Sequence, residues 1–351
     1  MYAALIPPVL GCSEHARFED GAVEAYRRRH ARFDGGHALS LIERYTDAVF
    51  PPRNLGGKAA NEYRFARVRR ENDAEIPVDA KHGPWRFDLL GPVGPSCTNV
   101  ESFGTQTKFT EGTAAARERS GLDFERKAAC GLTEYPEGCV VISVGSNGQF
   151  NFEADVVRRT RCRVAVFDCT VDPGRVVVPR ELRPRVELFY KCLGTFRFGE
   201  KSERNRVYDW GRRRYVDLGL QRHHFISYAQ ALEMARVHGP PAFLKMDIEG
   251  YEWEVLPTLM SRPDAAPQQI AIELHFETQM PGLPWFGRLK SPTELMALGL
   301  TLRHNGFFIV SRQDNRLCFH CTELLLVRDP CSNNSSNRWR VRPAGARLLE
   351  A

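Results

Sequence analysis

Charged side chains gather at the end of an apolar strand in the stretch FLKMDIEGYEWEVL, residues 243–256. Lys245, Asp247 and Glu249 follow one another at alternate positions. Because alternate residues of a strand point to the same face, these three side chains would share one face. Burial of charges without partners is costly, so we expect them at the mouth of the strand, where they can pair or meet a ligand.

A second pair of chemically active side chains, Glu273 and His275, ends the apolar run IELHF. These two residues are again two apart and would lie on one face. With Asp247 and Glu249 they would form a cluster of three carboxylates and an imidazole. Such a cluster can act as a general base for a hydroxyl, bind a hard divalent metal, or hold a substrate by hydrogen bonds. We expect the first role, and a divalent metal stays an alternative that is not predicted.

A turn of small residues follows the apolar run CVVISVG (139–145) and consists of Gly145, Ser146, Asn147 and Gly148. Small residues let the backbone approach a ligand closely, and the N-terminus of a following helix favours anionic groups. The turn does not match G-x-G-x-x-G, which argues against a nicotinamide cofactor.

Asp168 ends a second apolar run, CRVAVFD (162–168). In α/β folds that bind nucleosides, an acid about 20 residues after the glycine turn accepts hydrogen bonds from the ribose hydroxyls. The alternative is an acid in an ordinary surface turn. We predict the ribose role for Asp168.

Seven apolar runs predict the strands that position these residues, and segments of helical periodicity separate most of them. Strands alternating with helices indicate an α/β fold with a mostly parallel sheet. The last two runs have no helix between them and predict an antiparallel edge hairpin. The expected strands cover 139–145, 162–168, 185–194, 242–248, 268–276, 306–315 and 321–328, and the expected helices cover 151–160, the part of 223–239 that ends at Gly239, 251–256 until Pro257, and 291–306.

The residues before this alternating pattern are irregular and rich in Gly, Pro and Arg, with one expected helix over 36–52. We therefore divide the chain into an N-terminal extension of unknown role (1–90), an α/β domain (91–330) and a polar C-terminal tail that we expect to be flexible (331–351).

The composition limits the partners of the chain, which has 351 residues and a formal net charge of +6. The basic runs RRRH (27–30) and GRRRY (211–215) fit solvated faces better than a nucleic-acid groove, because no long basic stripe interleaved with aromatic residues accompanies them. No nucleic-acid partner is predicted. No segment reaches the ~18 apolar residues that a membrane span needs. The first residues make a poor signal peptide, which indicates the cytoplasm unless a truncated N-terminus has lost a leader for the secretory pathway.

The chain has ten cysteines, a density below that of a disulfide scaffold. Cys97, Cys130 and Cys139 lie near the entry to the apolar core and could pair if the chain is secreted. The motif CFHC (318–321) lacks a second pair of zinc ligands at suitable spacing, so no metal site is predicted there.

In their order along the chain, these motifs resemble those of class I S-adenosylmethionine-dependent methyltransferases. Within that class LKMDIEGYEWEVL resembles the hallmark of the FkbM family. The chain is most similar to the methyltransferase-like protein 24 group, over about residues 90–328. The shared elements are GPVGPSC (91–97), CVVISVGSNGQFNFE, FDCT, LKMDIEGYEWEVL, IELHF and a late N...C..E pattern (315–323).

The resemblance implies a Rossmann-like sheet of seven strands with helices on both faces and S-adenosyl-L-methionine as the cofactor. It places the turn from Gly145 to Gly148 beside the methionine part of the cofactor, and Asp168 with Cys169 beside the ribose. FkbM members are generally O-methyltransferases, often of sugars or secondary metabolites, which implies a small-molecule or saccharide acceptor. The residues that the resemblance places at the reaction centre are Asp247, Glu249, Glu273 and His275.

Two departures from the family pattern leave alternatives open. Ser143 stands where the usual acid of the first motif is expected, and Gln149 stands where its last glycine is expected. A catalytically silent S-adenosylmethionine- or nucleoside-binding protein, or an interaction protein, is therefore one alternative, and an NAD-dependent oxidoreductase is a weaker one. We predict a methyltransferase domain over 91–330 in which a carboxylate or His275 removes the proton of an acceptor hydroxyl.

Overall fold

The computed structural model describes residues 90–104 (apart from 92, 95, 96 and 98), 126–194, 206–209, 214–217, 222–275, 292–314 and 321–328. The predicted helix over 36–52, the N-terminal extension before residue 90 and the C-terminal tail lie outside the described residues. None of the helices among the described residues is long and apolar enough to cross a membrane.

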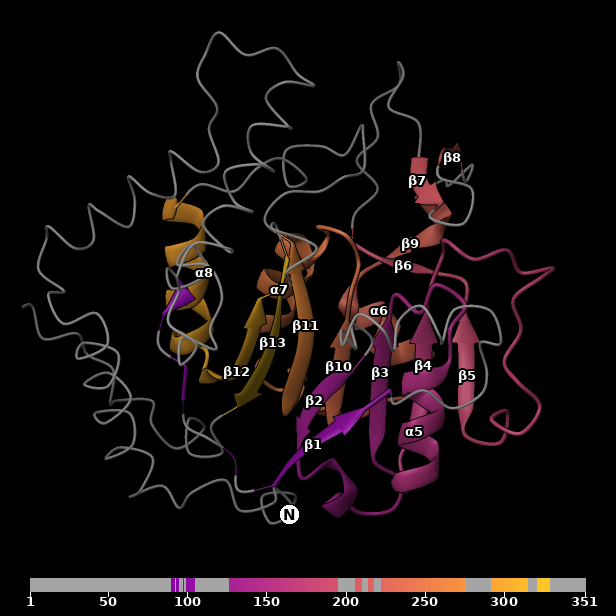
Figure 1. Ribbon diagram of the computed structural model, residues 1–351, viewed down its shortest axis with the longest axis horizontal. Coiled ribbons are helices and arrows are strands. Elements are labelled where there is room, and N and C mark those ends of the chain that lie inside the picture. Colours follow the sequence, from indigo (N-terminus) through magenta and orange to yellow (C-terminus); the bar gives the residue numbers. More distant parts are fainter. Residues whose placement is uncertain are drawn as a thin grey trace, which may run out of the picture.

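A seven-stranded sheet in the order β12-β13-β11-β10-β3-β4-β5 forms the centre of the fold (Figure 1). The β13 strand pairs antiparallel with both β11 and β12, which confirms the predicted mostly parallel sheet with an edge hairpin. The parallel strands are β3 (Val140–Val144), β4 (Arg163–Phe167), β5 (Val186–Phe189), β10 (Phe243–Met246) and β11 (Gln269–His275), and the hairpin consists of β12 (Phe307–Asp314) and β13 (Cys321–Arg328).

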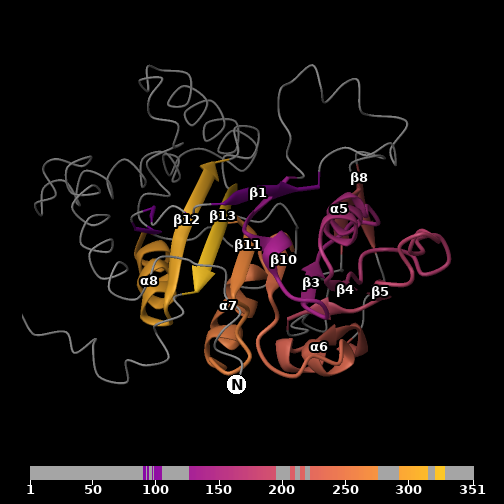
Figure 2. The same cartoon turned by 90° about the horizontal axis from the view of Figure 1, so that it is seen from below.

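Helices cover both faces of this sheet, as the sequence predicted (Figure 2). One face carries α5 (Asn151–Arg159) and a hairpin of β1 (Val100–Phe103) and β2 (Lys127–Cys130). The other carries α6 (Tyr228–Met234), α7 (Glu252–Met260) and α8 (Pro292–His304). Each face has its own cluster of buried apolar side chains, because successive strand residues alternate between the two faces. The sheet is therefore covered on both sides, and its strand ends are where a ligand can enter.

The structure corrects the predicted ends of two helices. The helix predicted to end at Gly239 ends at Met234, where Val237 N–H donates to the Leu232 carbonyl and Arg236 N–H donates to the Glu233 carbonyl. These two bonds form a Schellman motif with Arg236, at φ 51°, in the left-handed position. An arginine in place of the usual glycine hid this end from sequence reasoning.

The second corrected helix is α7, which continues through Pro257 to Met260. Proline in a helix interior costs about 3 kcal/mol or more. Burial of large apolar side chains contributes about 1.5–3 kcal/mol each, so Leu256, Leu259 and Met260, all buried, outweigh that cost.

Short elements complete the described part of the chain. The strand predicted over 185–194 is divided into β5 and β6 (Cys192–Leu193), and β6 pairs with β9 (Phe225–Ile226) outside the main sheet. The β7 (Arg206–Asp209) and β8 (Arg214–Asp217) strands form a separate hairpin. Single turns of 3-10 helix lie at Leu132–Glu134 and Arg222–His224.

Three disulfides join the described residues: Cys97–Cys130, Cys139–Cys162 and Cys169–Cys192. The first was among the pairings that the sequence left open, and Cys139 pairs instead with Cys162. Cys321 is also disulfide-bonded, so it has no free thiolate to offer a zinc ion at CFHC. The Cys139–Cys162 bond ties the beginning of β3 to the beginning of β4.

We predict that removal of the Cys139–Cys162 disulfide destabilises the fold without changing the carboxyl ends of the strands. The pair closes a loop with a sequence separation of 23 residues. A loop of this size restricts the unfolded chain enough to stabilise the folded state by about 3 kcal/mol. Replacing both cysteines by serine should lower the free energy of unfolding, measured by urea titration, by about 2–4 kcal/mol. Reductant should lower the urea midpoint of the unmodified protein at least as far, and a midpoint insensitive to reductant would contradict the prediction.

Candidate active site

The predicted site residues lie at the carboxyl ends of neighbouring parallel strands. The sheet order reverses between β3 and β10, because the chain proceeds from β3 towards β4 and β5 on one side and from β10 towards β11 on the other. In open α/β sheets, ligands bind in the crevice at such a switch point. The glycine turn follows β3, and the DIEG segment (247–250) follows β10, so both predicted motifs lie at this switch point.

The glycine turn and the DIEG segment are in direct backbone contact. Gly145 has φ 79°, and a Cβ atom built on it would lie 1.8 Å from the Asp247 carbonyl oxygen. No side chain fits there, so this glycine is required both by its conformation and by the close approach. Asp247 N–H donates to the Val144 carbonyl at 3.1 Å, which fixes the two segments together. The position of the Asp247 side chain therefore depends on the glycine turn.

Asp168 holds the glycine turn in shape. One carboxylate oxygen accepts hydrogen bonds from Ser146 N–H at 2.9 Å, Asn147 N–H at 2.6 Å and the Ser146 hydroxyl at 3.1 Å. The other oxygen accepts from the backbone N–H and hydroxyl of Thr170. The side chain is buried, and these bonds use its acceptor capacity. The structure thus gives Asp168 a bracing role for the turn, and its contact with a ribose stays a prediction.

Cys169, the other residue that the sequence placed at the ribose, is part of the Cys169–Cys192 disulfide. The bond ties the segment after β4 to β6. Cys169 is therefore a support next to Asp168 and not a free thiol.

Lys245, two residues before the DIEG segment, makes its hydrogen bonds with the backbone at the glycine turn. Its ammonium group donates to the Gly145 carbonyl in a close contact and lies 3.4 Å from the Val144 carbonyl. The side chain is 7% exposed. The lysine thus satisfies carbonyl groups at the end of β3 from the neighbouring strand.

A buried lysine on the β1–β2 hairpin pairs with acids of the cluster formed by Asp247, Glu249, Glu273 and Glu323, which we call the acidic mouth. The Lys127 ammonium lies 2.5 Å from a Glu323 carboxylate oxygen and 3.7 Å from an Asp247 carboxylate oxygen, and the side chain is 2% exposed. Glu323 faces Glu273 directly across the β11–β13 ladder. Like charges opposite one another destabilise a sheet, so a cation or a proton must be present. Lys127 provides the cation.

The remaining repulsion is relieved by a proton on Glu273. Burial, together with the negative charges of Asp247 and Glu323, raises the pKa of Glu273 to about 8. Burial would also raise the pKa of Asp247, but the ammonium groups of Lys127 and Lys245 and the charge of His275 reverse that effect and lower it to about 2. At neutral pH the mouth therefore contains an ionised Asp247 beside a protonated Glu273.

His275 is held between two carboxylates. Its Nδ1 lies 3.2 Å from Glu252, its Nε2 lies 3.5 Å from Glu249, and the side chain is 3% exposed. Burial alone lowers the pKa of an imidazole, but Glu252 and Glu249 outweigh it and raise the pKa of His275 well above 6.5. His275 is thus charged at neutral pH. It can orient Glu249 but has little capacity left to accept a proton.

Glu252 also builds the turn that carries Glu249. Its carboxylate is fully buried and accepts hydrogen bonds from Ile248 N–H and Gly250 N–H, both at 2.8 Å. Glu249 adopts φ 56°, a conformation that non-glycine residues rarely take. Such backbone strain persists only where the surroundings enforce it, and it is concentrated at functional sites. Glu249 is 43% exposed, so its carboxylate can reach a ligand.

The sequence predicted most members of this cluster and missed some of its supports. The structure brings Asp247, Glu249 and His275 together, with ligand atoms within 4.8 Å of one another, and Glu273 interacts electrostatically with Asp247 and His275. Lys127 lies on a short strand in an irregular region, and its pairing depends on long-range contacts. Glu252 was interpretable only as a residue of the α7 first turn, and Glu323 only as part of the late N...C..E pattern.

A divalent metal at this mouth finds limited support. Asp247, Glu249 and His275 offer suitable atoms, but the Lys127 ammonium already compensates Asp247 at 3.7 Å. A second group, formed by Glu273, His275 and Cys321, has no thiolate because Cys321 is disulfide-bonded. The metal stays an alternative that we do not propose.

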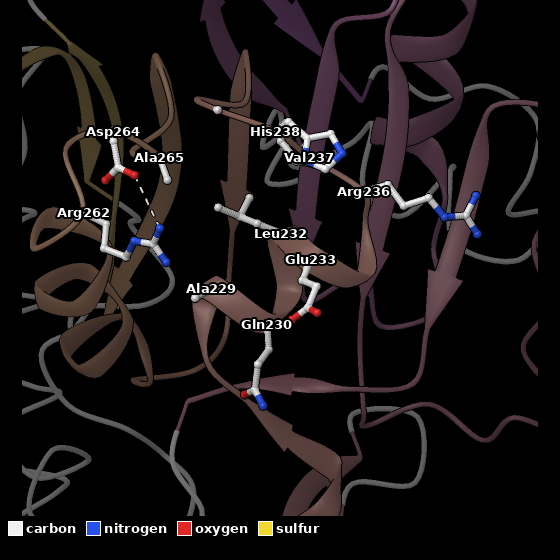
Figure 3. A pocket seen from close by; sticks show the side chains of 11 residues that line it. Ala229, Gln230, Leu232, Glu233, Arg236, Val237, His238, Arg262, Asp264 and Ala265 are labelled. Atoms are coloured by element: carbon white, nitrogen blue, oxygen red, sulfur yellow. Dashed lines mark hydrogen bonds and ion pairs between the residues drawn. The ribbon is translucent and has the colours of Figure 1, made fainter.

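Two cavities lie away from the predicted site residues. The larger, of about 510 Å³, lies beside α6 and the segments that lead into β10 and β11, at the amino ends of these strands and away from the predicted site (Figure 3). Its lining has mixed charges, including Glu233, Arg236 and the Arg262–Asp264 ion pair. A smaller cavity, of about 310 Å³, lies between α6 and α7. Neither has the acidic lining of the mouth.

A family model described as "Methyltransferase domain" matches residues 128–328, more than half of the chain. No curated protein matches the chain.

Several solved structures are similar to the chain at low identity. One is the fibrillarin pre-rRNA processing protein of Methanococcus jannaschii, at 12% identity, 55% of this chain, 67% of that chain and a TM-score of 0.28. Another is an O-methyltransferase family protein from Burkholderia thailandensis, at 15% identity, 57% and 53% coverage and a TM-score of 0.31. A third is a candidate tRNA (m1A22) methyltransferase from Streptococcus pneumoniae in complex with S-adenosyl-L-methionine, at 12% identity, 56% and 70% coverage and a TM-score of 0.29. Structural similarities this weak give no information about the methyl acceptor of this chain.

We predict that the proton on Glu273 makes the stability of the fold dependent on pH. The pKa of Glu273 is raised from 4.5 to about 8, so its contribution to stability is fully present below pH 4.5 and is lost as the pH rises towards 8. Glu273→Gln, which mimics the protonated form, should show a smaller fall in melting temperature over this range than the unmodified protein. The exposed Glu181→Gln is the matched control. If the melting temperatures of Glu273→Gln and the unmodified protein fall equally between pH 4.5 and 8, the prediction is contradicted.

We also predict that Glu252→Gln lowers the pKa of His275, since it removes the carboxylate next to Nδ1. NMR titration of the imidazole would measure the change. One of the two turn N–H groups would face the new amide nitrogen, which should cost about 1–3 kcal/mol of stability. His275 stabilises the fold fully below pH 6.5 and loses that effect as the pH rises through its folded pKa, so the stability difference between the two proteins should shrink at alkaline pH. An unchanged His275 titration would refute the pairing.

Proposed function

The chain belongs to the methyltransferase domain family, and we propose that it transfers a methyl group from S-adenosyl-L-methionine to a hydroxyl oxygen of a small molecule or saccharide. The observation that carries the proposal is the contact between the glycine turn and the DIEG segment at the switch point of the sheet. This contact brings a turn that can border a cofactor against the carboxylates that can serve an acceptor.

The crevice fits a cationic cofactor in its chemistry. Bound S-adenosylmethionine would supply an electrophilic methyl group on a positively charged sulfur. Glu249 is the carboxylate that a positively charged sulfur could approach, because it is 43% exposed, whereas Asp247 and Glu323 already face the Lys127 ammonium. We assign the turn from Gly145 to Gly148 to the methionine part of the cofactor and the segment at Asp168 to its ribose side, in keeping with the resemblance found in the sequence.

Glu249 is our candidate for the general base. It is the most exposed carboxylate of the DIEG pair, and partial burial with the neighbouring charges of Asp247 and Glu252 raises its pKa despite the attraction of His275. A base with a raised pKa accepts a proton more effectively than Asp247, whose pKa is about 2. Asp247 would accept a hydrogen bond from the acceptor and orient it, while His275 and Glu252 hold Glu249 in place.

The reaction would be a displacement at carbon, in which the acceptor oxygen takes the methyl group as the bond between carbon and sulfur breaks and the sulfur becomes a neutral thioether. Glu249 would accept the hydroxyl proton. The protein's contribution is mainly to hold the two reactants in line, with the proton acceptor in reach.

The charge of the mouth supports a neutral acceptor. Nucleic-acid binding depends on lysine and arginine contacts with phosphates, whereas the cations of the mouth, Lys127 and His275, already face carboxylates. A sugar or another neutral hydroxyl compound needs no such contacts. The finer resemblance to FkbM enzymes and to the methyltransferase-like protein 24 group is consistent with such an acceptor, and we retain it as part of the proposal.

The disulfides favour an oxidising compartment. Disulfides persist in secreted proteins and in the lumen of the endoplasmic reticulum, and are rare in the cytosol. The three described pairs therefore support the secretory alternative over the cytoplasmic one.

Calorimetric titration of the purified chain with S-adenosylmethionine, S-adenosylhomocysteine and NAD tests the cofactor assignment. We predict binding of the first two and no binding of NAD. Asp168→Ala should weaken both bound ligands, because the glycine turn loses its brace. Binding of neither nucleoside would remove the methyltransferase proposal and leave the interaction protein as the leading alternative.

Formation of S-adenosylhomocysteine from S-adenosylmethionine in the presence of acceptor pools tests the catalytic assignment. Glu249→Gln should lower turnover by about 10²–10⁴-fold, the usual contribution of a general base, with little change in cofactor affinity. Asp247→Asn should also cost turnover more than affinity. Unchanged turnover in Glu249→Gln would remove it as the base, and binding without turnover in any pool would favour a catalytically silent protein.

A further inference from the structure

One disulfide begins beside the residue that braces the glycine turn. Cys169 directly follows Asp168, whose carboxylate accepts hydrogen bonds from the N–H groups of Ser146 and Asn147. The sulfur of Cys169 is bonded to Cys192 of β6, which lies outside the seven-stranded sheet. The bond therefore connects the brace of the glycine turn to a separate part of the fold.

The segment that follows Cys169 packs against the glycine turn. A Cβ atom built on Gly148 would lie 3.1 Å from a methyl group of Val176 and 3.8 Å from one of Val171. The Tyr190 hydroxyl donates to the Val176 carbonyl at 2.7 Å. Residues in β6 and just before it thus hold this segment at two points, one by the disulfide and one by a hydrogen bond.

The β6 end of the disulfide is anchored beside the DIEG segment. Leu193 of β6 is buried in the core, and Gly194 N–H donates to the Ile226 carbonyl at 3.0 Å. A Cβ atom built on Gly194 would lie 2.8 Å from the ring of Tyr251, which directly follows the DIEG segment. The disulfide therefore ties the brace of the glycine turn to a packed part of the fold on the acceptor side.

We propose that the Cys169–Cys192 disulfide makes cofactor binding dependent on the redox state of the chain. In the oxidised protein the bond holds the Asp168 brace and the segment after it in position for S-adenosylmethionine. In the reduced protein this segment loses one of its two anchors, and a bound ligand must order it again. The inference rests on the proposed function and goes beyond it, because it assigns control of the cofactor site to two cysteines that take no part in the reaction.

The redox step is a thiol–disulfide exchange with a dithiol reductant. One thiolate of the reductant attacks a sulfur of the Cys169–Cys192 bond, and its second thiol then resolves the mixed disulfide. The protein gains two electrons and two protons and ends with two thiols, while the reductant leaves as a disulfide. Cys192 is half-buried, so a small dithiol has access to this side of the bond.

Two double variants separate this role from ordinary stabilisation. The Cys169–Cys192 and Cys139–Cys162 bonds each have a sequence separation of 23 residues, so the loss of either should lower the urea midpoint similarly. Only the first bond adjoins the glycine turn, since the second joins the beginnings of β3 and β4. Calorimetric titration with S-adenosylmethionine and S-adenosylhomocysteine compares their effects on cofactor binding.

Cys169→Ser combined with Cys192→Ser should weaken the binding of both ligands by about tenfold, the cost of ordering one freed backbone residue. Cys139→Ser combined with Cys162→Ser should leave both affinities unchanged. The proposal is overturned if the first variant binds as tightly as the unmodified protein, or if the two variants lose affinity equally.

Titration of the unmodified protein with dithiothreitol is a second test that does not depend on the folding of a variant. Alkylation and peptide mass mapping at each concentration identify the bonds that have opened, and circular dichroism monitors the fold. The affinity for S-adenosylmethionine should fall in step with the opening of Cys169–Cys192. If the affinity persists after this bond has opened, or if its opening unfolds the chain, the inference is refuted. Failure of the oxidised, unmodified protein to bind either ligand would instead refute the proposed function.

Discussion

The buried ammonium of Lys127 is the interaction on which the acidic mouth depends. Glu273 and Glu323 are placed opposite one another by the pairing of β11 with β13, and Asp247 lies nearby on the segment after β10. Without a cation, the carboxylates of Asp247 and Glu323 would repel one another even though Glu273 is protonated. Lys127 comes from the β1–β2 hairpin, outside the sheet, so the mouth is complete only when the hairpin is in place. Gln269 on β11 secures that position, because its side-chain amide bonds to both the N–H and the carbonyl of Cys130.

The same dependence links the cofactor side of the site to the acceptor side. Asp168 fixes the glycine turn, the turn presses against the Asp247 carbonyl, and Glu252 fixes the backbone that follows. Each step is a short-range contact that allows little displacement. A change at the turn is therefore transmitted to the carboxylates without any large movement. This arrangement suits a displacement reaction, in which the rate depends on how accurately the two reactants are aligned.

Much of this fold was predictable from the sequence, because apolar strands and glycine turns are local signals. The runs at 139–145 and 242–248 identified their strands, and alternation placed Lys245 and Asp247 on one face. The predicted helix ends at Gly239 and before Pro257 were wrong, since an unusual cap at Arg236 and the packing of α7 overrode local preference. Residues such as Lys127 were not predictable, because a lone lysine in an irregular segment gives no sign of the carboxylates it will meet.

The charges that the sequence suggested for one purpose have separate purposes in the structure. Lys245, Asp247 and Glu249 looked like one catalytic face, yet Lys245 binds carbonyl groups at the end of β3, and only the two acids reach the mouth. His275 likewise looked like a base, but two carboxylates hold it as a cation. Period-two alternation predicts which residues share a face and not how far each lies along the crevice. The burial of each side chain separates these roles. The buried Lys245 and His275 contact neighbouring groups of the protein, and the more exposed Asp247 and Glu249 can reach a ligand.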